Sequence, residues 1–509
     1  MEKHKTYILL LAMLSAIASY AQSGILDPSF GNGGIVTTYI AGDYNSGEAL
    51  VVQPDGKIVV ASQAGDAFTF KVAVARYNSD GTLDSSFGNS GTLIIPVGTA
   101  RSYARNIALQ EDGKIVIGAY TYDDVESDFA LVRLHADGTL DTSFGNNGVV
   151  IADGGDQEIA DAMTILEDGK ILLAGNTYYN FLAAKFNEDG TLDTSFGNNG
   201  WLNIQFDGSD SQAKDVTFQN DGKILFAGYT IEISSGRYGM AAARINPDGS
   251  LDNSFGSSGR ISFNIGNYDD YAVAVEVQTD GKIILGGYTG AAPNYTKHDF
   301  AAVRLNSDGS FDSSYGNWGI AIARVIDDGL NYVEEMLIQP DNKIILAGYA
   351  ALNNDSNVAM LRLDTDGIVD TSFGVDGKIS TDINGNDDFG KAISLQPDNK
   401  IILTGFSYTN QFVAEMVVAR YDNIILGTPD YHNLEFSLYP NPAKHNISIR
   451  SNNLSSFYQI EILDMLGKKV FTSEIQKLDD IDISDLTAGT YLLRLHSRTN
   501  SNVARFIKH

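Results

Sequence analysis

The sequence contains no cysteine, which excludes several kinds of chemistry at once. Disulfide bonds, thiolate catalysis, iron–sulfur clusters, cysteine-based zinc sites and a lipidated N-terminal cysteine all require a residue that this chain lacks. Basic residues are also few, because 35 Lys and Arg stand against 64 Asp and Glu, for a formal net charge of −29. Binding of nucleic acid needs a basic surface that neutralises phosphates, so this charge argues against a nucleic-acid partner and disfavours docking on anionic lipid.

Histidine is almost missing from the long middle of the chain, where His135 and His298 stand alone between residues 25 and 422. A Ser-His-Asp triad or a site with several histidine metal ligands is therefore not expected there. No catalytic residue and no cofactor is predicted.

Long apolar runs are also lacking outside the first 21 residues. The run Tyr7 to Ala18 follows a charged start and is too short to span a bilayer, and Ser19-Tyr20-Ala21 places small residues at the −3 and −1 positions of a cleavage site. We therefore predict a secretory signal peptide at residues 1–21, a mature chain that begins at Gln22, and no transmembrane helix.

What the sequence does have is a repeat of about 57 residues. The phrase Leu-Asp-x-Ser-Phe-Gly, or a close variant, closes each unit, and successive copies lie 57, 57, 52, 59, 60 and 58 residues apart. The aromatic residues of the seven copies are Phe30, Phe87, Phe144, Phe196, Phe255, Tyr315 and Phe373. Self-similarity at a fixed period indicates a repeat architecture. The alternation of apolar and polar residues within each unit predicts short antiparallel strands.

Each unit also carries Asp-Gly-Lys between two apolar segments, which predicts a hairpin turn. Asp caps such a turn with its side chain, and Gly adopts the positive φ that the turn requires. Two units replace the glycine by Asn342 and Asn399, and asparagine is the residue that next best tolerates this conformation.

Four or five strands per unit, repeated seven times, predict an all-β fold, a seven-bladed β-propeller over residues 22–426. A β-solenoid is the alternative, but its coils are shorter and lack internal hairpins. The first element, Leu26 to Gly31, has no strand before it, and the last, Val417 to Tyr421, has no closing phrase after it. The N-terminal segment is therefore expected to complete the seventh blade and to close the ring, which would remove an exposed strand edge.

The repeats resemble the delta-60 repeat family of bacterial β-propellers, a resemblance that implies a fold and no agreed activity. Residues 427–433 read as a linker, and residues 434–509 form a different small all-β unit. The motifs that carry its resemblance are Tyr439, Pro440, Asn441 and Pro442, followed by Gly489 and Tyr491. This unit resembles the type A C-terminal sorting domain of the type IX secretion system of Bacteroidota. The resemblance implies an immunoglobulin-like β-sandwich, recognised by the secretion machinery of a Gram-negative bacterium, and a protein that is secreted or displayed on the outer membrane.

The repeated aspartates do not read as catalytic. A catalytic pair of carboxylates needs two different environments to separate its pKa values, whereas Asp84, Asp141 and Asp193 occupy the same position in successive units. The loop from Asn78 to Asp84 and its counterpart from Asp364 to Asp370 faintly resemble calcium loops, but they lack the alternating oxygen ligands and distal glutamate of an EF-hand. We expect plain turns, and no metal site is predicted, with calcium as the alternative.

Two connections of each unit vary in length and are rich in Tyr, Asn, Asp and Ser, and they fall on one face of a propeller. The predicted ligand face contains Tyr120, Tyr122, Tyr178, Tyr179, Tyr229, Tyr288 and Tyr349. Neutral drift would also produce variable loops, and the tyrosines that follow a glycine would then pack between blades. We predict a non-catalytic binding or adhesion module for a glycan or protein. The alternative is an extracellular polysaccharide hydrolase or lyase, for which the sequence displays no evident carboxylate or histidine pair converging in the central channel.

Overall fold

The protein was analysed as a computed structural model. It describes residues 23–423 except 67, 100, 156, 291–296, 354 and 411–412, and residues 436–508 except 440–442, 452–456, 465–468, 475–480, 485, 488 and 498–500. Contacts divide the chain into two compact units, Met1–Ile425 and Leu426–His509. The described residues contain strands and no helix, so the predicted all-β fold is confirmed. The predicted signal peptide and linker lie outside the described residues.

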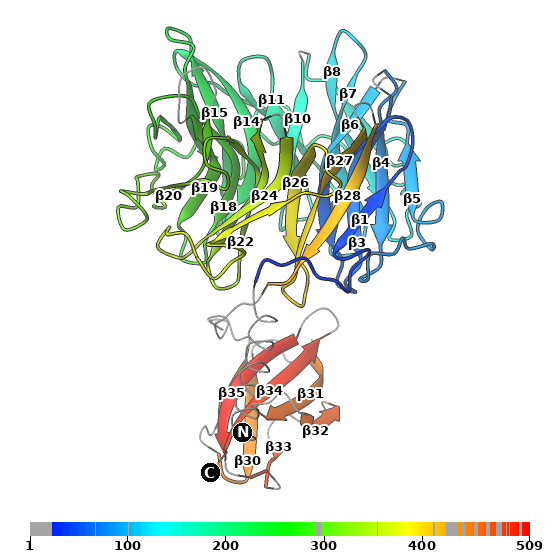
Figure 1. The fold of residues 1–509 in the computed structure, drawn as a ribbon, viewed down its shortest axis with the longest axis vertical. Coiled ribbons are helices and arrows are strands. Elements are labelled where there is room, and N and C mark those ends of the chain that lie inside the picture. The colour runs from blue at the N-terminus through cyan, green and yellow to red at the C-terminus, as the bar shows by residue number, and fades with distance from the viewer. Residues whose placement is uncertain are drawn as a thin grey trace, which may run out of the picture. The chain divides into compact units, whose positions relative to one another are not determined.

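The strands of the first unit form groups of four antiparallel strands (Figure 1), and one parallel bridge between Tyr44 and Ala414 joins the first and last groups into a single sheet. The first group contains β2 (Tyr44–Val52), β3 (Ile58–Gly65), β4 (Lys71–Tyr77) and β5 (Thr92–Ile95). The second contains β6 (Arg101–Leu109), β7 (Ile115–Tyr122), β8 (Ser127–Leu134) and β9 (Val149–Ala152). The third contains β10 (Ile159–Ile165), β11 (Ile171–Asn176), β12 (Phe181–Phe186) and β13 (Trp201–Ile204). The fourth contains β14 (Ser209–Phe218), β15 (Ile224–Glu232), β16 (Tyr238–Ile245) and β17 (Arg260–Phe263).

The later groups repeat this order along the chain. The fifth contains β18 (Asp270–Val277), β19 (Ile283–Gly290), β20 (His298–Leu305) and β21 (Ile320–Ala323). The sixth contains β22 (Leu330–Ile338), β23 (Ile344–Leu352), β24 (Asp355–Leu363) and β25 (Lys378–Thr381). The last contains β26 (Asp388–Leu395), β27 (Ile401–Asn410) and β28 (Val413–Tyr421), and its fourth strand is β1 (Ile35–Thr38). We call each group a blade. The first strand of each blade contacts the first strand of the next, and β26 contacts β2.

The N-terminal segment therefore supplies the outer strand of the blade that ends the array. Ile35 pairs with Ala419 at one end of the β1–β28 ladder, and Leu26 forms a separate bridge to Tyr421. Asp27 forms an ion pair with Arg420. The equivalent aspartate of each remaining blade forms the same kind of pair with an arginine or lysine of its own blade. These contacts attach the N-terminal segment to the last strand of the array.

The Asp-Gly-Lys turns join the first two strands of each blade as predicted. Gly56 has φ of 83°, and the two substitutes, Asn342 and Asn399, have φ of 60° and 67°. Because the turns after the first and third strands lie at one end of each blade, the variable connections lie together at the other end. We call that end the variable-loop end.

The closing phrase of each unit builds a buried ion pair, which we call the corner clamp. In the fourth blade, Arg244 Nε donates to Asp252 Oδ2 at 2.7 Å, and Lys223 Nζ lies 3.2 Å from the same oxygen. Ser254 donates its N–H and hydroxyl to Asp252 Oδ1 at 3.0 and 2.8 Å. Burial alone would raise the pKa of Asp252, but these hydrogen bonds and the two cations hold it well below its usual range. The corresponding pairs are Arg76–Asp84, Arg133–Asp141, Lys185–Asp193, Arg304–Asp312, Arg362–Asp370 and Arg420–Asp27.

The corner clamp also joins neighbouring blades. The Arg244 guanidinium lies 4.8 Å from the centre of the Phe255 ring and donates to the carbonyl of Ser307 in the fifth blade. Gly309 of that blade has φ of 85°, and a Cβ there would meet the Phe255 ring at 3.0 Å. A glycine is therefore required for conformation and for space. This interlocking explains why Arg, Asp, Phe and Gly recur together, and it gives the repeated aspartates a structural role.

The second unit consists of two small sheets that share one apolar core. The first sheet contains β29 (Phe436–Tyr439), β30 (Asn446–Ser451) and β33 (Ile481–Asp482). The second contains β31 (Phe457–Asp464), β32 (Lys469–Glu474), β34 (Gly489–Ser497) and β35 (Ser501–Lys508). Buried side chains from both sheets, such as Ile447 and Leu493, form one cluster, as in a β-sandwich. No helix in the described part of the chain is long and apolar enough to cross a membrane.

A candidate functional site in the central cavity

The first strand of every blade contains a β-bulge at the same place. In β14 the pairing with β15 shifts between Ala213 and Asp215, so Lys214 has no partner residue in the ladder. A bulge bends its strand and re-aims a side chain, and bulges are common beside functional sites. The residues at this position are Glu48, Arg105, Asp161, Lys214, Val273, Glu334 and Lys391.

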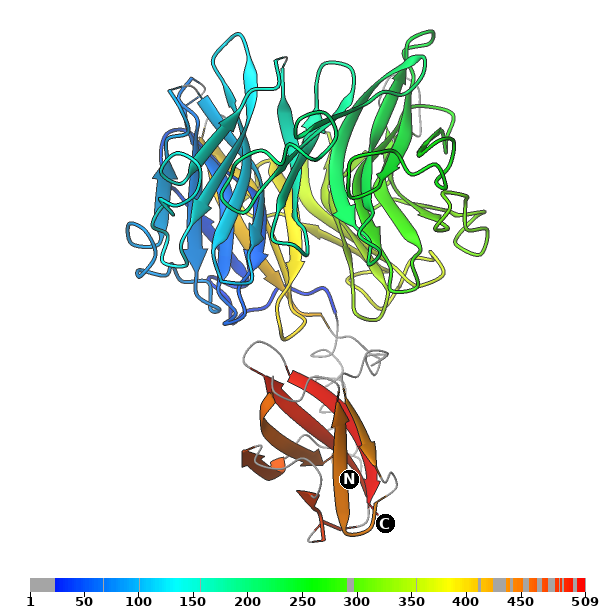
Figure 2. The ribbon, with the colours of Figure 1, turned by 180° about the vertical axis from the view of Figure 1, so that it is seen from behind.

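All seven bulge residues line one cavity of about 490 Å³, which we call the central cavity. Each comes from a different blade, and the strands that carry them contact one another in sequence, with β26 beside β2. The cavity therefore lies where the first strands of all the blades meet, and the reverse view in Figure 2 shows the blades standing around that middle region. Its volume lies within the range of small-molecule sites, roughly 300–1,000 Å³.

The bulge residues alternate in charge around the cavity. Glu48 pairs with Arg105 of the next blade at 3.2 Å, and Asp161 pairs with Lys214 at 3.2 Å. Glu334 and Lys391 form a third pair at 2.9 Å, and the position between the second and third pairs holds the neutral Val273. We call these seven residues the charge ring. Its three cations and three carboxylates are matched one to one.

Two further carboxylates line the cavity directly after the bulge. Asp215 accepts N–H groups from Val216 and Val275, both at 2.7 Å, and Glu335 accepts the N–H of Met336 at 2.9 Å. Burial raises the pKa of Asp215 to about 7. Burial, together with the charge of Asp215, raises the pKa of Glu335 well above its usual range. Among the described residues neither carboxylate has an ion-pair partner.

Aromatic rings form a nearly continuous wall nearer the variable-loop end. Tyr271 stacks on Tyr288 across two strands at 4.8 Å, and Tyr332 stacks on Tyr349 at 5.0 Å. Edge contacts such as Tyr288–Tyr332 at 5.0 Å join one blade to the next. We call this chain of rings the aromatic belt. Its members are Tyr120, Tyr103, Phe70, Tyr44, Phe406, Phe389, Tyr349, Tyr332, Tyr288, Tyr271, Tyr229 and Tyr238.

The structure places the seven tyrosines of the predicted ligand face in different settings. Tyr229, Tyr288 and Tyr349 lie in strands and line the central cavity, where their rings also pack between blades. Tyr178 and Tyr179 are exposed in the connection between β11 and β12, with 55% and 60% of their surface accessible.

The remaining two tyrosines lie in the second blade. Tyr120 ends the aromatic belt, and its hydroxyl lies 3.3 Å from a guanidinium nitrogen of Arg105. Tyr122 is half-buried under the guanidinium of Arg101. Four of the seven predicted residues therefore belong to the aromatic belt, and Tyr122, Tyr178 and Tyr179 lie outside it.

Sequence reasoning missed the charge ring and the two carboxylates beside it. Each bulge residue stands nine positions before the turn lysine of its unit, for example Lys214 before Lys223. Reading that single position along the seven units gives Glu, Arg, Asp, Lys, Val, Glu and Lys. This alternation of charge at one repeat position is the sequence signal from which the charge ring could have been predicted.

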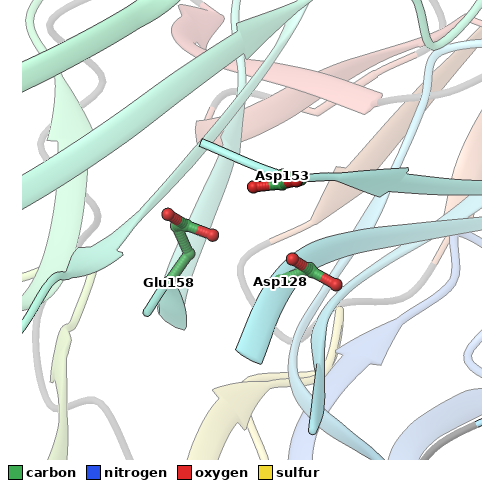
Figure 3. Close-up of side chains that lie close together, drawn as sticks. All are labelled: Asp128, Asp153 and Glu158. Atoms are coloured by element: carbon green, nitrogen blue, oxygen red, sulfur yellow. The ribbon is translucent and has the colours of Figure 1, made fainter. Parts of the chain in front are cut away.

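A second acidic group lies at the variable-loop end, shown in Figure 3. Carboxylate oxygens of Asp128, Asp153 and Glu158 all lie within 4.8 Å of one another. Burial and the nearby Asp153 raise the pKa of Asp128. Oxygen donors at such spacing suit a hard cation, so within the described residues this is the group that could share one metal ion.

The loops that resembled calcium sites use their carboxylates for local turns. Asp80 Oδ1 accepts the N–H and the hydroxyl of Thr82 at 2.9 and 2.7 Å. Asp364 Oδ1 accepts the N–H groups of Asp366 and Ile368, both at 2.9 Å.

The sorting-domain motif is only partly described. Tyr439 ends β29, and Gly489 begins β34. The buried Tyr491 donates its hydroxyl hydrogen to the carbonyl of Thr487 at 2.9 Å. Pro440, Asn441 and Pro442 lie outside the described residues.

Comparison with known families identifies both parts of the chain. Residues 53–87, 110–144, 166–196, 219–255, 278–315 and 339–373 match the family described as "Domain of unknown function (DUF5122) beta-propeller". Residues 437–509 match the family described as "Secretion system C-terminal sorting domain". The chain carries DUF5122 propeller repeats and a sorting domain. The predicted recognition of both parts is confirmed, and the sorting domain indicates export to a secreted or cell-surface location. The last blade is built from both ends of the array, so its closing phrase near Phe30 precedes its hairpin turn at 398–400 in the sequence. No matched segment covers this blade.

No curated protein matches the sequence. Solved structures resemble its fold at low identity. Polysaccharide lyase Uly1 is 12% identical, with a TM-score of 0.47, over 78% of this chain and 92% of that one. A virginiamycin B lyase from Staphylococcus aureus is 9% identical, with a TM-score of 0.43, over 76% and 98%. The β-propeller domain of the Trilobed protease from Pyrococcus furiosus is 12% identical, with a TM-score of 0.40, over 78% and 100%. At these identities and TM-scores the similarity concerns the fold alone and says nothing about activity.

Proposed function

We propose that this protein is a non-catalytic binding module, delivered by the type IX secretion machinery, and that its ligand is held in the central cavity. The observation that supports this most directly is the contrast between two positions of the repeat. The corner clamp uses almost the same residues in each blade, whereas the bulge position uses five residue types in seven blades. A position that is structurally equivalent but chemically different in successive blades forms an asymmetric site, and such a site can recognise one ligand in one orientation.

The aromatic belt supports a ligand with a flat or hydroxylated surface. Tyrosine provides a large contact area at low entropic cost, together with a hydroxyl for hydrogen bonding. Five tyrosines line the cavity: Tyr229, Tyr271, Tyr288, Tyr332 and Tyr349. They come from three consecutive blades, the fourth to the sixth, so the tyrosines gather on one side of the cavity, whereas charged residues occur around all of it.

A glycan and protein array probed with the mature chain tests this proposal. The Tyr332→Ala variant removes a ring from the cavity and is expected to lose most of the bound signal. The Tyr178→Ala variant removes an exposed ring outside the cavity and serves as the matched control. If the control loses binding and the cavity variant keeps it, the ligand binds the loops and the proposed site is wrong.

A polysaccharide hydrolase or lyase is the second candidate, because two carboxylates with raised pKa values line the same cavity. A carboxyl group that titrates near neutral pH suits general acid–base catalysis. Incubation with a panel of bacterial and algal polysaccharides would release reducing ends or ultraviolet-absorbing unsaturated ends. The Asp215→Asn variant is expected to abolish such release, and Glu111→Gln, an exposed carboxylate at the opposite end of a blade, is expected to leave it unchanged. If the wild-type protein releases no products from the panel, the enzymatic alternative is rejected for those substrates.

A further inference from the structure

The central cavity has more carboxyl groups than cationic groups. Its lining contains five carboxylates and three cations, and the cations are already paired with Glu48, Asp161 and Glu334. The two carboxylates left over are Asp215 and Glu335. An anionic ligand would have to displace a carboxylate from its ion pair and would place a negative charge near two carboxyl groups that have no cation beside them. The charge inventory therefore disfavours an acidic ligand.

The two unpaired carboxylates are held in fixed positions by the backbone. Both oxygens of Asp215 accept N–H groups, one from its own strand and one from β18 of the next blade. These bonds orient the carboxylate but supply no full positive charge, and burial disfavours its ionised form. A cationic group of the ligand would supply the missing charge.

The aromatic side of the cavity also favours a cation. Tyr229 already receives a cation from the protein, because Lys214 Nζ lies 5.8 Å from the centre of its ring. In the same way the Arg105 guanidinium lies 5.5 Å from the Tyr120 ring. The faces of aromatic rings attract ammonium groups, more strongly when water is excluded. Val273, the neutral member of the charge ring, adds an apolar surface for the body of a ligand.

A divalent metal ion fits this cavity less well than an organic cation does. Calcium takes six to eight oxygen ligands and magnesium demands a near-octahedral set. Within the described residues, the group of three or more carboxylates close enough to share one ion is Asp128, Asp153 and Glu158, and none of these lines the cavity.

We infer that the central cavity binds a small organic cation, whose primary ammonium group lies at Asp215 and Glu335 and whose body packs against the tyrosines. This inference rests on the proposed function, because it names the ligand class of the same site. Two sources carry this chemistry, a simple alkyl amine and an amino sugar. Both present an ammonium on a body small enough for about 490 Å³.

Titration calorimetry on the mature full-length chain tests the inference with three probes. Cadaverine presents an alkyl ammonium, deacetylated chitotriose presents sugar ammonium groups, and fully acetylated chitotriose presents the same sugar without charge. We expect at least one ammonium probe to bind, and the acetylated sugar to bind about tenfold more weakly or not at all, as expected for loss of a charged hydrogen bond. Binding by cadaverine alone assigns an alkyl amine, and binding by the sugar alone assigns an amino sugar.

Two variants and one control locate the site. Asp215→Asn and Glu335→Gln are each expected to weaken binding about tenfold, which corresponds to removal of one charged hydrogen bond. Glu111→Gln removes an exposed carboxylate outside the cavity and should leave affinity unchanged. Far-ultraviolet circular dichroism identifies a variant that fails to fold, in which case the other variant decides the result.

A pH series supplies an independent readout. Binding of an ammonium favours the ionised carboxylates, so the affinity for cadaverine, whose ammonium groups stay charged over this range, should rise from pH 6 to pH 8 and its binding should release protons. The titratable groups that interact with Asp215 are Glu276 and Glu335, and those that interact with the neighbouring Lys214 and Glu335 are Asp161, Tyr229, Arg105 and Glu334.

Three results would overturn the inference. These are preference for the acetylated sugar, unchanged amine binding in both cavity variants, and displacement of the amine by calcium at stoichiometric concentration. If no amine binds while an array ligand is still lost in Tyr332→Ala, the inference fails and the proposed function stands.

Discussion

The corner clamp makes a quantitative prediction about stability, tested by replacing Asp252 with alanine. The change leaves the Arg244 guanidinium, 5% exposed, without its carboxylate at 2.7 Å, and it leaves Lys223 without its partner at 3.2 Å. Removal of one partner from a buried ion pair costs about 3–5 kcal/mol, because the other charge stays buried without compensation. The variant should therefore fold but unfold at a clearly lower temperature.

The expected shift in melting temperature follows from the size of the propeller. Unfolding entropy is about 2.1 cal/mol/K per residue, so a domain of about 400 residues changes its Tm by about 1.2 °C for each kcal/mol. A loss of about 3–5 kcal/mol then lowers Tm by about 4–6 °C. Differential scanning fluorimetry of the mature chain at pH 7 can measure this difference.

The chain provides a matched control four residues earlier. Asp248 also accepts the N–H and hydroxyl of a serine two residues on, at 2.9 and 2.7 Å, but it is exposed and has no ion-pair partner in the described part of the protein. Asp248→Ala should lower Tm much less than Asp252→Ala does. Equal shifts for the two variants would refute the reasoning, because the local turn alone would then explain the stability.

Acidification should reduce the difference between wild type and Asp252→Ala. The pKa of Asp252 in the folded protein lies well below its usual range. The stability that this carboxylate provides is therefore present above its unfolded pKa, near 4, and is lost as pH falls toward the folded value. A gap in Tm that stays constant from pH 7 to pH 3 would contradict this assignment.

Three further predictions concern other parts of the first unit. Lys391→Ala and Glu334→Ala should show a coupling energy of about 1 kcal/mol in a double-mutant cycle measured by urea unfolding, because the pair is only partly buried. Deletion of residues 22–38 should lower Tm and promote aggregation, measured by light scattering, because the edge of β28 loses β1; a circular permutant that places the segment after residue 423 should restore both. Asp215→Asn should raise Tm relative to wild type more at pH 8 than at pH 5. The folded pKa of about 7 lies above the unfolded value, so ionisation of Asp215 removes stability as pH rises toward 7, by at most roughly 4 kcal/mol and less where the cavity is wet.

The sequence was sufficient to predict the features that depend on local residue types. The turn at Asn342 needs a residue that tolerates positive φ, and the corner at Phe255 needs the glycine of the next blade beneath its ring. Each requirement acts on a few neighbouring residues and recurs in every unit. The pairing of β1 with β28 could also be anticipated, because each incomplete end of the array lacks what the other supplies.

The site could not be predicted in the same way, because the bulge does not demand a residue type. Lys214 and Val273 occupy the same backbone position, so a search for similarity between units passes over it. The aromatic belt depends on register instead: Tyr271 lies opposite Tyr288 only once the strands are paired. Tyr288 therefore reads from sequence as the start of a variable loop, although it belongs to a strand that lines the cavity.

The charge ring restricts how an array of this kind can change its length. Repeats recombine readily. Because the residues of the corner clamp are nearly the same in every unit, an extra blade could form this clamp with its neighbours almost anywhere in the array. The ring is less permissive: duplication of the blade that carries Arg105 would set two cations side by side, and loss of the blade that carries Asp161 would do the same. Duplication or deletion of two adjacent blades of opposite sign preserves the alternation. The corner clamps thus allow any blade to pack beside any other. The charge ring, in contrast, favours only those numbers and orders of blades that keep opposite charges adjacent.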